Sequence, residues 1–202
     1  MKEHEYFAVN NEKRMFMKWQ GTDWIMHGVF VDDVMYTSTS TEMFKAFFKL
    51  YAKDFSFSGG DLMTYFLGMD IEQEDGYIKL HLDTYMQEML DEYKNHIKWD
   101  LKPKKIPMQP GVIMTKDDCQ ETPDPKELKF YRSMRAKVHF VAHWIRFDVS
   151  YTVAQLARFC ASAGVSHWAA LHHLMGYLEH NPNFKLIYRA GHVSGLDGFG
   201  LG

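Results

Sequence analysis

A pair of adjacent aspartates, Asp32 and Asp33, most constrains how this chain can fold. The residues on either side of the pair, 25–31 and 34–37, are rich in β-branched and aromatic side chains. Two such runs around a minimal polar link predict a tight β-hairpin. Side chains alternate between the two faces of a strand, but the alternation breaks at a hairpin tip. Both carboxylates can therefore lie near one point in space.

Two carboxylates at a hairpin tip suit a divalent cation. Mg²⁺ takes hard oxygen ligands, usually one or two protein carboxylates together with substrate phosphates and water. The alternative is a solvated turn, in which Asp32 and Asp33 only supply residues that tolerate turn conformations. The spacing of the two residues leaves both interpretations open.

The composition is that of an ordinary globular protein, with 46% hydrophobic and 24% charged residues among 202. No segment approaches the ~18 consecutive apolar residues of a membrane helix. Residues 1–5 lack the apolar segment of a secretory signal, so a cytoplasmic or nuclear location is expected and no membrane contact. Two cysteines are too few for a disulfide framework or a cysteine-rich zinc site.

The formal net charge of -3 argues against a protein that coats nucleic acid along its whole surface, because phosphate neutralisation needs lysine and arginine. Charge is nevertheless concentrated in residues 94–105, where five lysines accompany a single aspartate. These lysines are Lys94, Lys98, Lys102, Lys104 and Lys105. Such a segment either contacts phosphates or is a solvated helix end and loop.

Strands are expected at residues 6–9 and 15–19, pairing beside the Asp32-Asp33 hairpin in one antiparallel sheet. Thr39 and Glu42 have the spacing of a capping box, which predicts that a helix begins there and covers one sheet face. Its apolar stripe would contain Phe44, Phe47, Phe48, Tyr51 and Phe55. A second hairpin is expected from residues 65–72 and 77–82, around the Asp75-Gly76 pair.

The second half of the chain has helical periodicity. Asp83 is expected to cap a helix that buries Met86, Met89, Leu90 and Tyr93. A connector with three prolines follows, and Asp124-Pro125 begins a long helix. Residues 148–161 and 166–180 supply two more helices. The predicted fold class is α+β, with an antiparallel sheet and its covering helix followed by a helical region.

Several short motifs together resemble the reverse transcriptases of copia-type LTR retrotransposons. Phe30-Val31-Asp32-Asp33 is similar to the Tyr-x-Asp-Asp motif of the reverse-transcriptase palm, and residues 61–71 are similar to the family's DLGELxYFLGIEI segment. Further matches follow in the family's order and approximate spacing, at residues 131–133, 146–151, 156–159, 167–170 and 177–178. The resemblance covers roughly residues 5–190.

The resemblance implies an RNA-directed DNA polymerase that transfers nucleotides with two Mg²⁺ ions, with Mn²⁺ as an alternative. Asp32 would bind metal directly and Asp33 would support the site. Phe30 stands where the family usually has tyrosine, which removes a hydroxyl near the primer terminus but keeps an aromatic ring.

The resemblance also assigns domains and contacts. Residues 1–82 would be part of the palm, 83–190 the thumb and connection, and 191–202 a glycine-rich linker toward an RNase H domain. The primer-grip residues would be Leu67, Gly68 and Met69. The lysines between Lys94 and Lys105 would contact the phosphates of an RNA/DNA template-primer.

The family carries a further palm aspartate upstream, on a neighbouring strand, together with the fingers. Asp23 is the only aspartate before Asp32, roughly 30 Å away along the same strand at ~3.3 Å per residue. We therefore expect a polyprotein fragment of an element that replicates by reverse transcription and DNA integration, inactive alone. Its partners would be the upstream fingers–palm and downstream RNase H segments. The alternative is a non-catalytic nucleic-acid or protein interaction module derived from such an element.

Three other sites are less favoured by the sequence. His139 and His143 lie one helical turn apart, and with His167, His172 and His173 they allow a zinc site to be considered. Two aspartates after a strand are also found in the Mg²⁺ pocket of phosphoacceptor receiver domains, but there a loop and helix follow. The glycines of residues 198–202 lack the strand and helix that a dinucleotide-binding motif requires.

Overall fold

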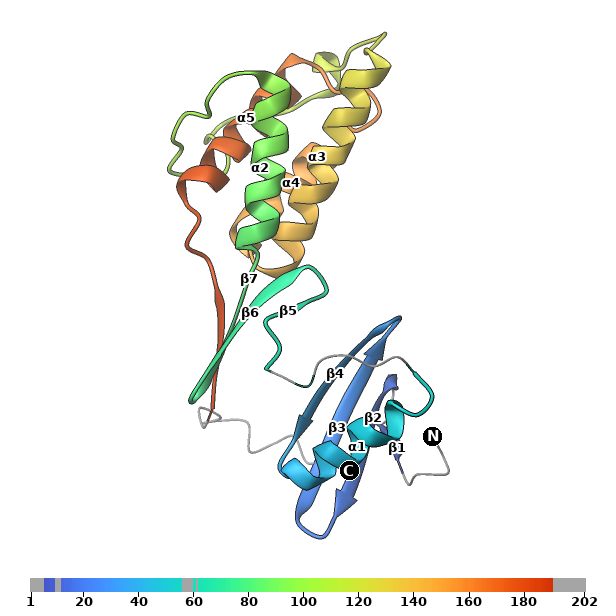
Figure 1. Cartoon of the computed structure of the whole chain (residues 1–202). Coiled ribbons are helices and arrows are strands. Elements are labelled where there is room, and N and C mark those ends of the chain that lie inside the picture. Colours follow the sequence, from blue (N-terminus) through green and yellow to red (C-terminus); the bar gives the residue numbers. More distant parts are fainter. Residues whose placement is uncertain (1–5, 10–11, 56–59, 61, 191–202) are drawn as a thin grey trace. The chain divides into compact units, whose positions relative to one another are not determined.

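The chain divides into two units, Met1–Phe66 and Leu67–Gly202, each described by itself (Figure 1). The structure is a computed structural model and describes residues 6–9, 12–55, 60 and 62–190. Antiparallel sheets and helices are both present, which confirms the predicted α+β class. None of the helices described is long and apolar enough to cross a membrane. The predicted linker at residues 191–202, with its glycines, lies outside the described residues.

The first unit is a four-stranded antiparallel sheet in the order β1-β2-β3-β4, with one helix, α1, on one face (Figure 1). The bounds are β1 Phe7–Val9, β2 Glu12–Gln20, β3 Asp23–Phe30, β4 Asp33–Ser38 and α1 Thr41–Tyr51. Its small core consists of Ile25 from β3 and Met43 and Phe47 from α1, one helical turn apart. The predicted sheet and its covering helix are thus confirmed.

Two details at α1 differ from expectation. The N-cap is Ser40, whose hydroxyl accepts a hydrogen bond from the Met43 N–H at 3.3 Å, so the predicted capping box at Thr39 is wrong. Thr39 instead accepts the Trp24 N–H at 2.9 Å and ties the helix start to β3. The helix ends at Tyr51, and Phe55, which we expected on its apolar stripe, lies beyond it and is exposed.

The second sheet has the order β5-β6-β7-β8 and contains the second predicted hairpin. Its bounds are β5 Tyr65–Phe66, β6 Met69–Glu74, β7 Tyr77–His81 and β8 Leu186–Arg189. Glu74 pairs with Tyr77 around Asp75-Gly76, where Gly76 has φ 82° as this tight turn requires. β8 was not predicted; it pairs antiparallel with β7, Leu80 opposite Leu186, and joins the end of the described chain to this hairpin.

Four helices complete the second unit: α2 Asp83–Ile97, α3 Pro125–Trp144, α4 Ser150–Ala157 and α5 Val165–His180. Two 3-10 turns, Lys116–Asp118 and Phe147–Val149, lie between them. Asp124 caps α3 by accepting the Lys126 N–H at 2.8 Å, with Pro125 in the first turn, as predicted. The expected buried face of α2, formed by Met86, Met89, Leu90 and Tyr93, is confirmed.

Asp83, in contrast, does not cap α2. The N-cap is Leu82, which makes no side-chain cap bond. Asp70 of β6 acts in its place, because its carboxylate accepts the Thr84 N–H at 3.1 Å and the Thr84 hydroxyl at 3.0 Å. A carboxylate near a helix start also interacts favourably with the helix dipole. Capping from a distant strand is invisible to local sequence rules, and here it fixes the second hairpin to α2.

Candidate functional site

The Asp32-Asp33 pair lies at the tip of the β3–β4 hairpin. Phe30 pairs with Asp33, so the turn consists of Val31 and Asp32 alone. Asp32 is in the turn, Asp33 is the first residue of β4, and both side chains are exposed. This confirms the predicted hairpin with two accessible carboxylates at one end.

Val31 adopts an unusual backbone conformation for a β-branched residue, with φ 54°. Valine at positive φ is a genuine outlier, and such a conformation costs of order 1–3 kcal/mol. Its side chain is also 81% exposed, so burial does not offset the cost. The flanking strand pairs hold the turn in this form. Strained residues of this kind concentrate at active sites and ligand clamps, so the strain at Val31 supports a functional role for this turn.

The sheet presents Asp33 on the face opposite α1. Cross-strand partners share a face, so Asp33 lies with Phe30 on one side, and Gly28 and Met35 follow them along the strands. The other side carries the residues that pack with α1, among them Val34. Phe30 is 42% exposed, and the Arg14 guanidinium lies 6.0 Å from the centre of its ring. The helix therefore leaves the carboxylate-bearing face open.

The hairpin tip supplies carboxylate oxygens from Asp32 and Asp33, and these donors fit a hard divalent cation such as Mg²⁺. Within the described residues, no group of three histidine, cysteine, aspartate or glutamate side chains is arranged to hold a metal ion. Asp23 begins β3 at the far end of the same strand, opposite Gln20. The two aspartates therefore fit half of a metal site, and further ligands would have to come from a substrate or from another segment.

The predicted primer-grip residues form the turn before the second hairpin. Leu67 and Gly68 connect β5 to β6 with φ 51° and 85°. Met69 begins β6, and its side chain is buried in the core of the second unit. A Cβ atom on Gly68 would lie 3.1 Å from the Phe140 ring, so this turn packs closely against α3. The turn therefore has a fixed neighbour in α3, and its primer-grip role remains a prediction.

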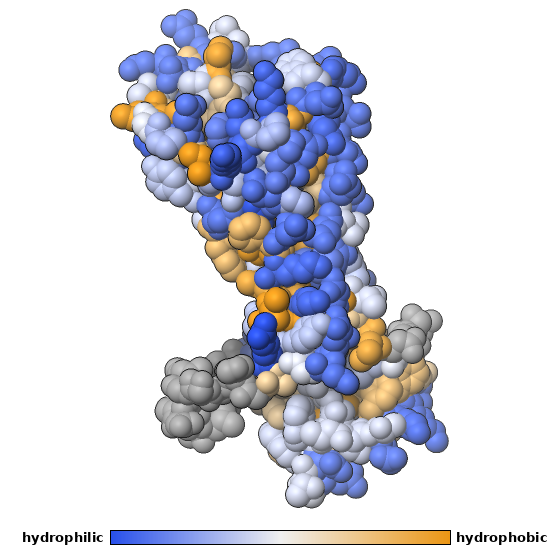
Figure 2. All heavy atoms as spheres, turned by 90° about the vertical axis from the view of Figure 1, so that its left-hand side faces the viewer, coloured by the Kyte–Doolittle hydropathy of each residue, from blue (hydrophilic) through white to orange (hydrophobic). Residues whose placement is uncertain are grey.

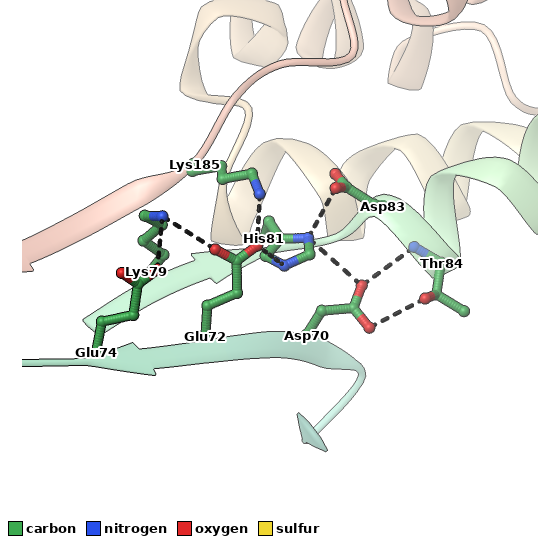
Figure 3. A network of polar contacts seen from close by, with 8 residues as sticks. All are labelled: Asp70, Glu72, Glu74, Lys79, His81, Asp83, Thr84 and Lys185. Carbon is green, nitrogen blue, oxygen red and sulfur yellow. Dashed lines mark hydrogen bonds and ion pairs between the residues drawn. The ribbon is translucent and has the colours of Figure 1, made fainter. Parts of the chain in front are cut away.

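A polar network fixes the second hairpin to its neighbours (Figure 3). His81 of β7 lies among three carboxylates: its Nδ1 is 2.9 Å from Asp83, and its Nε2 is 3.2 Å from Glu72. Asp70 is the third, at 3.8 Å from Nδ1. Lys185, just before β8, donates to Glu72 at 2.7 Å. Sequence analysis missed this cluster, although acidic residues at positions 70, 72 and 74 of one strand, with Lys79 and His81 on the next, were a signal for it.

The lysines of that network also shift the Glu72 pKa. Hydrogen bonds from Lys185 first, and then from Lys79, lower the pKa of Glu72 to about 2. Glu72 therefore stays ionised at neutral and at mildly acidic pH. It links β6 to β7 through Lys79 and to the start of β8 through Lys185.

The basic segment, residues 94–105, begins in the last turn of α2, and the part after the helix lies along α5. The Asn181 side-chain amide donates to the Lys104 carbonyl at 3.0 Å, and His173 Nε2 lies 3.0 Å from the Ile106 carbonyl. A Cβ atom on Gly176 would lie 2.4 Å from the Lys102 carbonyl oxygen, so only glycine allows this approach. The segment is thus fixed on a helix rather than extended into solvent.

The five predicted lysines of this segment are not equivalent. Lys94 is occupied by ion pairs with Glu179 at 2.9 Å and Asp91 at 3.4 Å. Lys98, Lys102 and Lys105 are exposed, and Lys104 is half-buried. For these four, the structure shows no ion pair within the described residues. Four cations are therefore available to a partner.

The histidines considered for zinc do not come together. His139 and His143 lie on α3 with ring centres 6.3 Å apart. His167 is fully buried, accepts the Gly164 N–H through Nδ1 at 2.9 Å, and has Nε2 3.2 Å from the Thr115 carbonyl. Its ring stacks on Phe159 at 3.9 Å. His167 thus stabilises the start of α5.

Comparison with known proteins relates this chain to reverse transcriptases and to transposon proteins. A family model described as "Reverse transcriptase (RNA-dependent DNA polymerase)" matches residues 1–110, which is more than half of the chain. The chain is 24% identical over 189 residues to a retrovirus-related Pol polyprotein from transposon RE2 of Arabidopsis thaliana, covering 94% of the chain. A relative from transposon RE1 of the same plant has the same identity and coverage.

A third relative is a transposon Ty5-1 protein of Saccharomyces cerevisiae, with 26% identity over 166 residues and 81% of the chain covered. The chain spans 12% of the length of the two Arabidopsis polyproteins and 51% of the yeast protein. No solved structure matches.

Proposed function

Because the chain belongs to the reverse transcriptase (RNA-dependent DNA polymerase) family, we propose that its β3–β4 hairpin contributes carboxylates to a nucleotidyl-transfer site. The relatives described above are transposon proteins and retrovirus-related Pol polyproteins, and we take this chain to be part of a similar copia-type element. The observation that carries it is the exposed Asp32-Asp33 pair at a strained two-residue turn, on the sheet face that α1 leaves open.

Each residue at the tip has a distinct task in this proposal. Asp32, in the turn, would bind a divalent cation directly, and Asp33 would hold that site through its carboxylate on the open face. Bound Mg²⁺ or Mn²⁺ ions would activate the attacking hydroxyl and neutralise the leaving pyrophosphate. Phe30 pairs with Asp33 and offers a ring without a hydroxyl to the primer end.

The second unit would hold the template-primer. We assign the hairpins of residues 1–82 to the palm and residues 83–190 to the thumb and connection. The turn formed by Leu67 and Gly68, rigidly packed on α3, would contact the primer strand through its backbone, since Met69 is buried. The exposed lysines of the basic segment would contact phosphates.

We expect residues 1–202 alone to show no primer extension with Mg²⁺ or Mn²⁺. Two-metal catalysis holds its ions about 3.5–4 Å apart with carboxylates from more than one strand. One hairpin tip provides half of that arrangement. Positioning of the reactants by other segments contributes a further ~7 kcal/mol or more of barrier reduction. A template-primer extension assay on the chain alone, and again with the fingers–palm segment of its own polyprotein added in trans, tests this.

Activity that appears only on complementation supports the proposal, provided that Asp32→Asn abolishes it. Asp23→Asn, at the other end of β3, is the matched control and should leave activity unchanged. Robust extension by residues 1–202 alone would show that the hairpin is not half of a site. If complementation restores nothing while nucleic acid still binds, the chain is a non-catalytic interaction module derived from a retrotransposon.

A second prediction concerns the basic segment. Lys102→Glu with Lys105→Glu should weaken nucleic-acid binding similarly for every sequence tested, because phosphate contacts carry no sequence information. Each lost contact should reduce the slope of log K against log salt by about 0.9 for duplex and 0.7 for single strands. Fluorescence anisotropy over a salt series measures both quantities. Lys126→Glu with Lys129→Glu on α3 is the matched charge control, and an equal effect from it would remove this role.

A further inference from the structure

Trp99 is largely exposed to solvent, although tryptophan is on average a highly buried residue. It lies two residues beyond the end of α2, and 62% of its surface is accessible to solvent. Lys98 ends the helix in the left-handed conformation, with φ 64°, and its N–H bonds to the Lys94 carbonyl at 2.9 Å. Tyr93, fully buried one turn earlier, anchors this end of α2 in the core. The backbone therefore presents the indole from a defined position.

A histidine of α5 and the lysines of the basic segment lie on the same side of the second unit as this indole. The His172 ring of α5 meets Trp99 edge to face, with ring centres 6.2 Å apart. One turn further along α5, a Cβ atom on Gly176 would lie 2.4 Å from the Lys102 carbonyl oxygen and 3.4 Å from the Lys104 side chain. Burial, and after it the charges of Lys104, His173 and Lys102, also lower the pKa of His172. Trp99, the His172 ring and the nearby lysines therefore form one surface, here called the Trp99 patch: Lys98, Trp99, Lys102, Lys104 and His172.

Acidic groups near the patch do not neutralise it. Glu179 is paired with Lys94 and Glu127 with His96, which leaves Asp100 as the acidic neighbour of Trp99 along the chain. In the upper part of Figure 2, hydrophobic side chains are separate spots among hydrophilic ones. The patch is thus one large aromatic ring among cations, which differs from the contiguous apolar area of a protein interface.

We propose that Trp99 is a stacking platform for an unpaired base of single-stranded nucleic acid, whose phosphates are held by Lys98, Lys102 and Lys104. A base has a π-face that stacks on indole whatever its identity, and a basic groove beside such a ring follows the backbone. Bases in a duplex are already stacked, so the patch selects single strands. The inference rests on the nucleic-acid contact proposed above for the basic segment, and adds a base-stacking residue and a preference for single strands.

The test compares a fluorescent single-stranded oligothymidylate with an abasic strand of equal length and with a duplex of equal length. Trp99→Ala should weaken binding of the oligothymidylate about tenfold, within the range for loss of one base stack, and leave the abasic strand unchanged. Trp99→Phe should recover part of the loss. Trp144→Ala, which removes another partly exposed tryptophan of the same unit, is the matched control and should have no effect. Circular dichroism checks the fold of each variant.

The outcomes separate this inference from the proposed phosphate contact. If Trp99→Ala weakens the abasic strand as much as the oligothymidylate, Trp99 acts through structure and not through stacking. If Trp99→Ala changes nothing while Lys102→Glu with Lys105→Glu reduces affinity, the stacking platform is wrong and the phosphate contact stands. If the wild-type chain binds none of the three probes, both fail, and the patch then fits a protein partner instead.

Discussion

Replacing Asp148 by alanine is expected to lower the free energy of unfolding by about 3–5 kcal/mol, because it leaves the buried Arg146 guanidinium without its carboxylate partner. Arg146 is fully buried, and its Nε and Nη2 donate to the two Asp148 carboxylate oxygens at 3.0 Å each. A guanidinium does not lose its proton in a protein, so it cannot escape the cost by becoming neutral. A typical domain is stable by only about 5–15 kcal/mol, so the loss is severe.

Other contacts connect this ion pair to the end of α5 and to the residues that follow it. Arg146 Nη1 donates to the Asn181 carbonyl at 2.8 Å, and the guanidinium lies 4.1 Å from the centre of the Phe184 ring. The Tyr177 hydroxyl donates to Asp148 at 2.7 Å. Burial raises the pKa of Asp148, but hydrogen bonds from Arg146 and Tyr177 outweigh it and lower that pKa. Since Asn181 also binds the Lys104 carbonyl, the pair supports the basic segment.

Urea unfolding of the full chain, followed by circular dichroism, measures the change. Asp117→Ala, at an exposed aspartate of the same unit, is the control and should stay within about 0.5 kcal/mol of wild type. Arg146→Met with Asp148→Leu should be less destabilised than Asp148→Ala, because no charge is then stranded. A loss below about 1 kcal/mol for Asp148→Ala would show that Arg146 is hydrated in solution.

Local chemistry made the hairpins and helices predictable. The Asp32-Asp33 tip, the Asp75-Gly76 turn and the Asp124-Pro125 helix start each depend on neighbouring residues, and each is confirmed. The buried face of α2 followed from helical periodicity in the same way. Within the candidate site, the position and exposure of both aspartates were therefore accessible to sequence reasoning.

What sequence reasoning missed depends on contacts between distant segments. Residues 186–189 form a strand because they pair with β7, more than a hundred residues earlier in the chain. Asp70 replaces Asp83 as the cap of α2 because the hairpin brings it there. Lys94 was grouped with its neighbouring lysines, but Glu179 of α5 occupies it. A local sequence pattern holds no information about which carboxylate from a distant segment will lie beside a given helix start or lysine.

The buried histidine of the first sheet, His27, should make the first unit less stable in acid. His27 is 1% exposed and packs among the rings of Tyr6, Phe16, Phe47 and Tyr51. Its Nε2 lies 2.9 Å from the Tyr51 hydroxyl, while its Nδ1 is buried without a hydrogen-bond partner in the described residues. Protonation would place a charge and an unmatched N–H in this core. Burial accordingly lowers the pKa of His27 to about 4.

The sign of the effect follows from linkage. The unfolded chain has an ordinary histidine pKa of about 6.5, so it binds the proton between pH 6.5 and 4 while the folded chain does not. The stability contributed by neutral His27 is present above pH 6.5 and is lost as the pH falls toward 4. At about 1.4 kcal/mol per pH unit, the loss is about 2 kcal/mol by pH 5 and about 3 kcal/mol by pH 4.

Hydrogen exchange of peptides from β2 to β4, corrected for the intrinsic rate at each pH, isolates this unit within the full chain. His27→Gln removes the titrating group and should abolish most of the loss between pH 6.5 and 5, whatever its effect on stability at neutral pH. His143→Gln, at an exposed histidine of α3, should leave the pH dependence of wild type intact. The same acid sensitivity in His27→Gln would assign it to other groups. Since His27 lies on the strand that leads to Asp32, its protonation would loosen the support of the carboxylate tip before the helical unit is affected.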